Sequence, residues 1–310
     1  MKRFLIFLLL AALLAGCTAS PSGIPAAGGV TFTDALGRTV TIENPQRVAA
    51  LLGSFADVWT LAGGALCAAA DDAWEDFGLT SESTVNIGGA HSPSLELLLS
   101  AAPDFVIASS STASNVQMRE TLEAAGIVVA YFDVDNFSDY LQMLDICTDI
   151  TGRKDLYERN GLQLQQQIEE IKTAAVQIPQ EQCKVLLIRA AASVIKAKGS
   201  TGTILGEMLA DMGCINIADS DTALLENLSV EAIIREQPYH IFVVTMGGDT
   251  EGAKAALEDM IRENPAWNSL EAIKSGRIHH MEKQLFNLKP NARWAEAYQK
   301  LYEILTKNEA

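Results

Sequence analysis

Two phrases of the same plan, far apart in the chain, most strongly limit the folds that this sequence can adopt. The first begins at Ser94 and the second at Ser229. In each phrase a Glu follows the Ser by two positions, a Pro follows that Glu by seven, and a continuous apolar run comes next. This order predicts a Ser-capped helix, its end at the Pro, and a buried strand. The repeat therefore predicts two α/β lobes of related plan.

The stretch between the two phrases predicts a helical spacer over residues 137–175. Apolar residues recur at helical spacing from Phe137 to Ile150, Gly152 offers a C-terminal stop, and the pattern resumes from Lys154. A helix of about twenty residues is roughly 30 Å long, enough to run down the side of a lobe.

Short alternating strands and helices on either side of the spacer predict an α/β fold with mainly parallel sheets. A small hairpin is expected at residues 31–42, ahead of the first buried strand. We expect the N-terminal lobe to cover residues 30–135, the spacer 136–178 and the C-terminal lobe 179–310.

The N-terminus carries an export signal. Lys2 and Arg3 precede an apolar run at residues 4–14, which is too short to span a bilayer. The Leu-Ala-Gly-Cys sequence ending at Cys17 resembles a bacterial lipobox. This resemblance implies a signal peptide over residues 1–16, a lipid on Cys17 and an extracytoplasmic, membrane-anchored protein. Residues 17–29, rich in Ser, Pro, Ala and Gly, are expected to form a flexible tether.

The net charge argues against one class of partner, and the cysteine spacing leaves the state of the thiols open. The chain has 39 acidic and 23 basic residues, a net charge of −16, which argues against nucleic acid as a partner. The other cysteines, Cys67, Cys147, Cys183 and Cys214, show no CxxC or metal-finger spacing. We expect buried free thiols, with a disulfide as the alternative.

Motifs of common α/β enzymes are missing from the sequence. There is no GxSxG elbow, no Walker phosphate loop and no GxGxxG after the first strand. The Gly and Ser residues at 199–202 could hold an oxyanion before a helix, but a simple turn is the expected reading. We therefore expect no enzyme activity, with a lipid-anchored α/β enzyme as the remote alternative.

The order of three further phrases resembles a known family. They are residues 34–48, residues 88–104 and residues 267–277. In this order they resemble the substrate-binding lipoproteins of bacterial ABC importers, in the helical-backbone class that captures ferric siderophores, haem or cobalamin. The resemblance covers roughly residues 30–307.

This resemblance implies two Rossmann-like lobes joined by a long rigid α-helix, with the ligand between them. It also implies that one surface Glu on each lobe, at Glu96 and Glu231, docks on an ABC permease dimer that works with an ATPase. The alternative is that each Glu only stabilises the N-terminus of its helix, by about 0.3–1 kcal/mol. We expect the chain to act as a monomer.

Candidate ligand-binding residues are those expected beyond the strand ends, where parallel sheets bind ligands. They are Ser54, Phe55, Trp74, His91, Ser110, Ser111, Asp133, Arg189, Lys198, Met246, Phe286, Asn287, Lys289 and Arg293.

Several of these candidates keep a second interpretation. Trp74 could stack on a flat ligand or cap the core of its lobe. Arg189 and Arg293 could pair with carboxylates or catecholates of a chelate, although Arg293 could equally form a surface ion pair. His91 could bind iron or haem, or simply hydrogen-bond within its turn.

The basic candidates favour a ferric siderophore as the ligand, with cobalamin or haem as alternatives. The ligand is expected to be an iron complex or a corrinoid, and no cofactor is expected. Adjacent His279 and His280 in a strand would face opposite sides and could not share one metal. We assign no metal-ligating residue.

Overall fold

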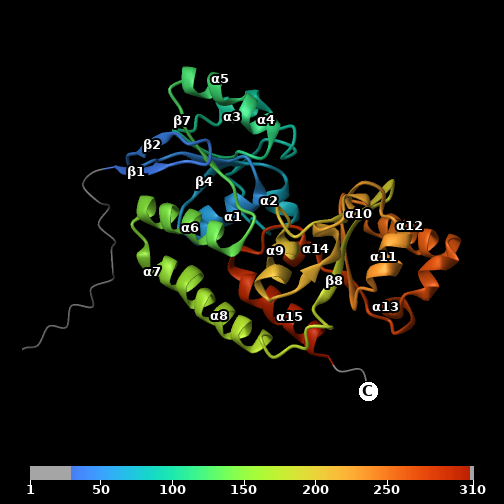
Figure 1. The fold of residues 1–310 in the computed structure, drawn as a ribbon. Coiled ribbons are helices and arrows are strands. Elements are labelled where there is room, and N and C mark those ends of the chain that lie inside the picture. The colour runs from blue at the N-terminus through green and yellow to red at the C-terminus, as the bar shows by residue number, and fades with distance from the viewer. Residues whose placement is uncertain (1–28, 308–310) are drawn as a thin grey trace, which may run out of the picture.

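The computed structural model of the chain describes residues 29–307, apart from the side chain of Thr222. Within that range the chain forms an α/β fold with two five-stranded sheets and one separate two-stranded hairpin (Figure 1). The prediction of two lobes with mainly parallel sheets is confirmed.

The first lobe is built on a fully parallel sheet. The hairpin strands β1 (Val30–Thr33) and β2 (Thr39–Ile42) precede it and pair antiparallel, as predicted. Its strands, in spatial order, are β5 (Val85–Asn86), β4 (Leu66–Ala69), β3 (Val48–Ala50), β6 (Phe105–Ser109) and β7 (Val128–Phe132). Because all five run the same way, their carboxyl ends meet at one edge.

Short helices cover this sheet. They are α1 (Gly53–Leu61), α2 (Asp72–Glu75), α3 (Leu95–Ser100), α4 (Ala113–Gln117) and α5 (Arg119–Ala124). Ser54 and Phe55, expected beyond the end of a strand, lie in helix α1, and Trp74 lies in helix α2. Helix α1 begins at Gly53, whose amide donates to Asp72 Oδ1 at 2.8 Å. A hydrogen bond from a distant residue thus satisfies an N-terminal amide that local sequence leaves unpaired.

The predicted spacer forms two helices, and only the second of them connects the lobes. Helix α6 (Phe137–Thr151) starts with a capping box at Asn136 and ends at Gly152, which has φ of 70°. It packs beside α1 and β1, within the first lobe. The connecting helix is the next one, formed by α7 (Lys154–Tyr157), a π-helical turn (Glu158–Leu162) and α8 (Gln163–Ala175). At 1.5 Å per residue it is roughly 33 Å long (Figure 1).

The second lobe has a mixed sheet. Its strands are β8 (Lys184–Ala191), β9 (Val194–Lys198), β10 (Ile215–Asn216), β11 (His240–Thr245) and β12 (Ile278–Met281). Strands β10, β8, β11 and β12 are parallel, while β9 folds back antiparallel on β8. The hairpin with β9 extends β8 to Ala191, past Arg189, which was expected beyond a strand end.

The helices of the second lobe surround that sheet. They are α9 (Ile204–Asp211), α10 (Thr222–Asn227), α11 (Val230–Glu236), α12 (Thr250–Glu263), α13 (Glu271–Lys274), α14 (Lys283–Phe286) and α15 (Trp294–Thr306), with 3-10 turns at Ile217–Asp219, Pro265–Ser269 and Asn291–Arg293. The two predicted Ser caps are confirmed. Ser94 and Ser229 each accept the amide of the residue three positions on, at 3.3 Å.

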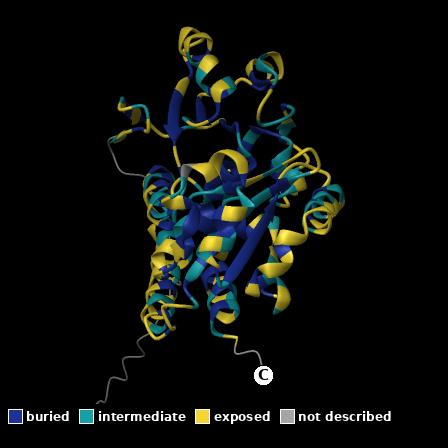
Figure 2. Cartoon of the chain, turned by 45° about the vertical axis from the view of Figure 1, so that its right-hand side comes forward, coloured by how far each residue is buried: buried dark blue, intermediate teal, exposed yellow. Residues whose placement is uncertain are grey.

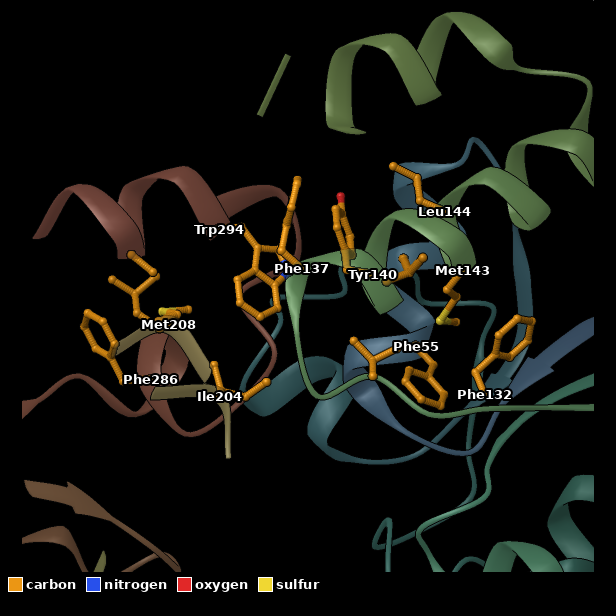
Figure 3. Packing of buried hydrophobic residues seen from close by; sticks show 14 of the residues in the cluster. Phe55, Phe132, Phe137, Tyr140, Met143, Leu144, Ile204, Met208, Phe286 and Trp294 are labelled. Atoms are coloured by element: carbon orange, nitrogen blue, oxygen red, sulfur yellow. The ribbon is translucent and has the colours of Figure 1, made fainter. Parts of the chain in front are cut away.

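One apolar cluster extends through both lobes. It contains Phe55 and Phe132 from the first lobe, Met208 from the second, and Trp294 from α15. The ring of Trp294 meets that of Phe137 edge-on, with centroids 5.9 Å apart (Figure 3). The strands of the sheets are buried and the outer helix faces are exposed (Figure 2). The lobes therefore share a core rather than touching only through the connecting helix.

Candidate functional site

Residues that follow the strands of one sheet contact residues that follow the strands of the other. Lys283, just after β12, pairs with Asp76, which follows α2, at 2.9 Å. The Asn291 side-chain amide donates to the Ser54 carbonyl and to an Asp57 carboxylate oxygen, each at 2.8 Å. The carboxyl edges of the two sheets therefore adjoin, and ligands of parallel α/β sheets bind at such edges.

Lys289, in the loop before α15, lies near several predicted residues of the first lobe. Its ammonium nitrogen lies 5.9 Å from the centre of the Phe55 ring. Burial lowers the pKa of Lys289, while the charge of nearby Asp133 acts in the opposite direction. Ser111 hydrogen-bonds Asp133, and the Ser110 amide donates to the Phe132 carbonyl at 3.1 Å. These contacts join the ends of β6 and β7 to the loop before α15.

The second lobe carries a group of three cations on one face of the β8–β9 hairpin. Arg189 lies directly opposite Lys196, and Lys198 lies two residues further along the same face. Within residues 29–307 none of the three forms an ion pair, and the buried Nε of Arg189 has no hydrogen-bond partner. Burial lowers the pKa of Arg189. It also lowers that of Lys198, helped by the charges of Arg189 and Lys196.

This group, Arg189, Lys196 and Lys198, is suited to an anion. Like charges directly opposite one another across two strands destabilise a sheet. An anionic ligand would relieve that repulsion and satisfy the unpaired guanidinium. The sequence analysis missed Lys196. The alternation of residues 194–198 is the signal that could have found it, since it places Lys196 and Lys198 on one face.

Two of these positions correct the predicted secondary structure. Arg189 was expected at a strand exit, but β8 continues to Ala191. Lys198 was expected in a turn and instead ends β9. Met246, in contrast, follows β11 as predicted; it is exposed, and its amide donates to the Ala190 carbonyl at 2.9 Å. That bond places Met246 beside the cation-bearing hairpin.

Three predicted ligand contacts are buried in the structure. Phe55 is 0% exposed, Phe286 is 3% exposed and Ser54 is 6% exposed. Phe55 meets Phe132 edge-on, with ring centroids 6.3 Å apart. The sequence placed these residues in loops, whereas helices α1 and α14 turn their side chains into the shared core. At these exposures all three side chains are largely covered by other parts of the protein.

The remaining candidates have separate positions. Trp74 lies on α2, partly buried against the shared core. His91 is exposed, in the turn before α3. Asn287 follows α14 and is partly buried. Arg293, predicted inside the last helix, lies in the turn before it and makes two hydrogen bonds with Glu296, at 2.7 and 2.8 Å. This is the surface ion pair that was its alternative interpretation.

Two histidines that are far apart in the sequence, His240 and His279, are neighbours in the structure. His240 Nδ1 and His279 Nε2 lie 2.9 Å apart, on the paired strands β11 and β12. Within residues 29–307 no three His, Cys, Asp or Glu side chains are grouped so as to hold a metal ion.

The two predicted docking residues lie on the surface. Glu96 and Glu231 are each exposed in the first turn of their helices, α3 and α11. Neither pairs with a Lys or Arg in the described part of the chain; the one contact is from the Ser229 hydroxyl to Glu231 at 3.2 Å. Leu97 and Leu99, beside Glu96, are also exposed.

The fold and the adjoining sheet edges agree with a family comparison. Residues 48–285 match the periplasmic binding protein family. The chain belongs to that family. Its members are binding proteins, and the resemblance noted from the sequence is thereby confirmed.

Two relatives from Bacillus subtilis (strain 168) show the similarity along most of the chain. The putative ABC transporter substrate-binding lipoprotein YhfQ is 24% identical, with 96% of each protein covered. The Fe(3+)-citrate-binding protein YfmC is 23% identical, over 81% of this chain and 77% of YfmC.

The fold also matches a solved structure, that of Staphylococcus aureus SirA complexed with staphyloferrin B. The TM-score is 0.69 at 18% identity, and the match covers 89% of this chain and 98% of SirA. At this identity the likeness shows the fold alone. Among the described residues no helix is both long enough and apolar enough to cross a bilayer. Cys17 and residues 1–28 lie outside the described residues.

Proposed function

We propose that the chain is the extracytoplasmic substrate-binding component of an ABC importer, and that it captures an anionic ferric chelate of the siderophore type. The observation that carries the ligand class is the group of Arg189, Lys196 and Lys198, which has no carboxylate partner among residues 29–307. Guanidinium and ammonium groups bind carboxylates and catecholates through charge-assisted hydrogen bonds.

The ligand binds, in this proposal, between the carboxyl edges of the two sheets. The second lobe supplies the three cations and Lys289, and the first lobe supplies Ser110, Ser111 and Asp133 near Lys289. Similarity to a protein named for binding ferric citrate supports a carboxylate-rich chelate. A flat corrinoid or haem is the second candidate ligand, because the ring of Trp74 is partly exposed and could stack on it.

We further propose that Glu96 and Glu231 dock on the permease dimer, which works with its ATPase. Both are exposed, carry no cationic partner in the described chain, and occupy matching positions in the two lobes. The exposed Leu97 and Leu99 would add apolar area to the contact.

The remaining parts of the proposal concern location and mechanism. Cys17 is the proposed lipid anchor, which the similarity to a protein named as a lipoprotein supports. The lobes are proposed to follow the boundaries 30–135 and 179–310, and the protein to act as a monomer. We infer capture and delivery rather than catalysis, since the family consists of binding proteins.

Tryptophan fluorescence titration tests the ligand class. The purified protein is titrated with ferric citrate, a ferric hydroxamate, a ferric catecholate, cyanocobalamin and haemin. We expect saturable, absorbance-corrected quenching at submicromolar concentration by one of the anionic ferric chelates. Saturation by cyanocobalamin or haemin alone would move the ligand to the second candidate, and the absence of saturation by all five would overturn both.

A further inference from the structure

Two of the four cysteines in residues 29–307 stand side by side at the amino end of the second sheet. Cys183 immediately precedes β8, and Cys214 immediately precedes β10. The two strands pair in parallel, with Ile215 opposite Lys184, and the Ile215 amide donates to the Cys183 carbonyl at 2.8 Å. Extending this register by one residue places Cys214 opposite Cys183.

Their side chains also point the same way. Both belong to the shared apolar cluster, and both are buried, at 4% and 8% exposed. The two thiols hydrogen-bond each other, and burial raises the pKa of each. Neighbouring strands lie about 4.8 Å apart. That spacing falls within the range of about 4.4–6.8 Å between Cα atoms that a disulfide bridges.

The other two cysteines have no such neighbour. Cys67 lies on β4, and Cys147 lies on α6, both in the first lobe. Neither thiol has a cysteine among the groups that perturb its pKa. Only the pair of Cys183 and Cys214 is therefore placed for a cross-link within the described chain.

We propose that Cys183 and Cys214 form a disulfide when the chain folds outside the cytoplasm. The compartment in this inference rests on the proposed extracytoplasmic location, since disulfides persist where the surroundings are oxidising. The oxidant is a dithiol–disulfide oxidoreductase in its disulfide form.

The exchange balances in two steps. The Cys183 thiolate attacks one sulfur of the oxidoreductase disulfide, which gives a mixed disulfide and releases one oxidoreductase thiolate. The Cys214 thiolate then attacks Cys183 sulfur, and the second oxidoreductase thiolate leaves. Two electrons pass to the oxidoreductase, and the two protons of the cysteine thiols end on its two cysteines.

The cross-link closes a loop that carries part of the proposed site. The segment between the two cysteines contains β8, β9 and α9, and so holds Arg189, Lys196 and Lys198. Closing a loop reduces the conformational freedom of the unfolded chain and thereby stabilises the fold. The disulfide would fasten the short strand β10 to the amino end of β8, whereas Arg189 lies near the carboxyl end of that strand.

Peptide mapping of the full chain, exported by a bacterial host, tests the inference. The protein is alkylated under denaturing conditions without reductant and then cleaved with trypsin. We expect one peptide pair, residues 173–184 joined to residues 199–235, that separates on reduction. Cys67 and Cys147 should be alkylated. The Cys147→Ala variant is the matched control and should keep the joined pair, whereas Cys214→Ser should lose it.

Reduction of the wild-type protein should also lower its unfolding temperature, and should leave that of the Cys183→Ser/Cys214→Ser variant unchanged. Full alkylation of Cys183 and Cys214 in the exported protein would overturn the proposal. A second experiment adds oxidised glutathione to the purified, reduced protein and asks whether the joined peptide pair forms without export. If the joined pair forms neither there nor in the host, the geometric argument fails as well. Neither result depends on the ligand, so the proposed function is judged separately.

Discussion

Arg189 is the residue on which the proposed ligand site most depends. Replacing it with Met should weaken binding of the ferric chelate by about 10- to 100-fold, the effect of about 1.5–3 kcal/mol from a charged hydrogen bond. The variant should not lose stability, because it removes a buried guanidinium nitrogen that has no partner. Fluorescence titration and thermal unfolding measure the two effects.

Arg262 provides the matched control for this variant. It is exposed on α12, where it pairs with Asp259 on its own helix. Arg262→Met removes the same charge and should leave the affinity within twofold of wild type. An equal loss of affinity in both variants would mean that only net charge matters.

The side chain of Asn291 connects the two lobes by hydrogen bonds. It is 0% exposed, has φ of 51°, and bonds both Ser54 and Asp57. Burial raises the pKa of Asp57, and the bond from Asn291 acts against this. Asn291→Gly, which tolerates the backbone angle, should lower the free energy of unfolding by about 2–3 kcal/mol through the lost bonds.

Chemical denaturation measures that loss, and Asn268→Gly on the surface is the control. If Asn291→Gly were as stable as wild type, the two hydrogen bonds would not hold the lobes together.

At the scale of elements, Gly152 separates α6 from the connecting helix. Its left-handed conformation, with φ of 70°, costs other residues about 1–2 kcal/mol. Gly152→Ala should therefore destabilise the protein by about 1 kcal/mol. Gly248→Ala, at a position where an added Cβ meets nothing within 4 Å, should be close to neutral. Denaturant midpoints of the two variants give the comparison.

The paired strands β11 and β12 carry a pH dependence. Burial and neighbouring positive charges lower the pKa of His240 to about 3 and that of His279 to about 4. Below pH 6.5 the unfolded chain therefore binds protons that the folded chain does not, so stability falls as the pH falls toward 4. His240 alone should cost about 2 kcal/mol at pH 5 relative to pH 8.

Unfolding free energies measured between pH 8 and pH 4.5 test this. His240→Gln should make the profile less steep, because Gln does not titrate there, while His279 should keep part of the slope. His91→Gln, in an exposed turn, should keep the wild-type slope. A wild-type profile that is flat in this range would contradict the burial of the pair.

The elements show where local sequence was informative. The buried strand β6 and the caps at Ser94 and Ser229 follow from apolar runs and side-chain chemistry within a few residues. The start of α1 and the length of β8 do not, because each depends on a distant partner: Asp72 for the first and β9 for the second. The same limit applies to the site. The charges of Arg189 and Lys198 made them predictable as candidates from the sequence. The burial of Phe55 and Phe286 was not predictable, because it depends on a core formed between the lobes.

For the whole molecule, the shared core predicts cooperative unfolding. Because one apolar cluster includes residues of both lobes and of α15, neither lobe can unfold without exposing the other. Calorimetry should show one transition, with equal calorimetric and van't Hoff enthalpies. Two separated transitions would contradict a common core. For the same reason, ligand binding should change the scattering radius only slightly.

The position of α15 has a consequence for synthesis. This helix, nearly the last part of the described chain, places Trp294 against Phe137, and the turn before it places Asn291 against Ser54. The first lobe therefore cannot complete its packing until residues 291–306 have emerged from the ribosome. A nascent chain that cannot finish folding early stays unfolded for longer, which would favour the export that we propose for this protein.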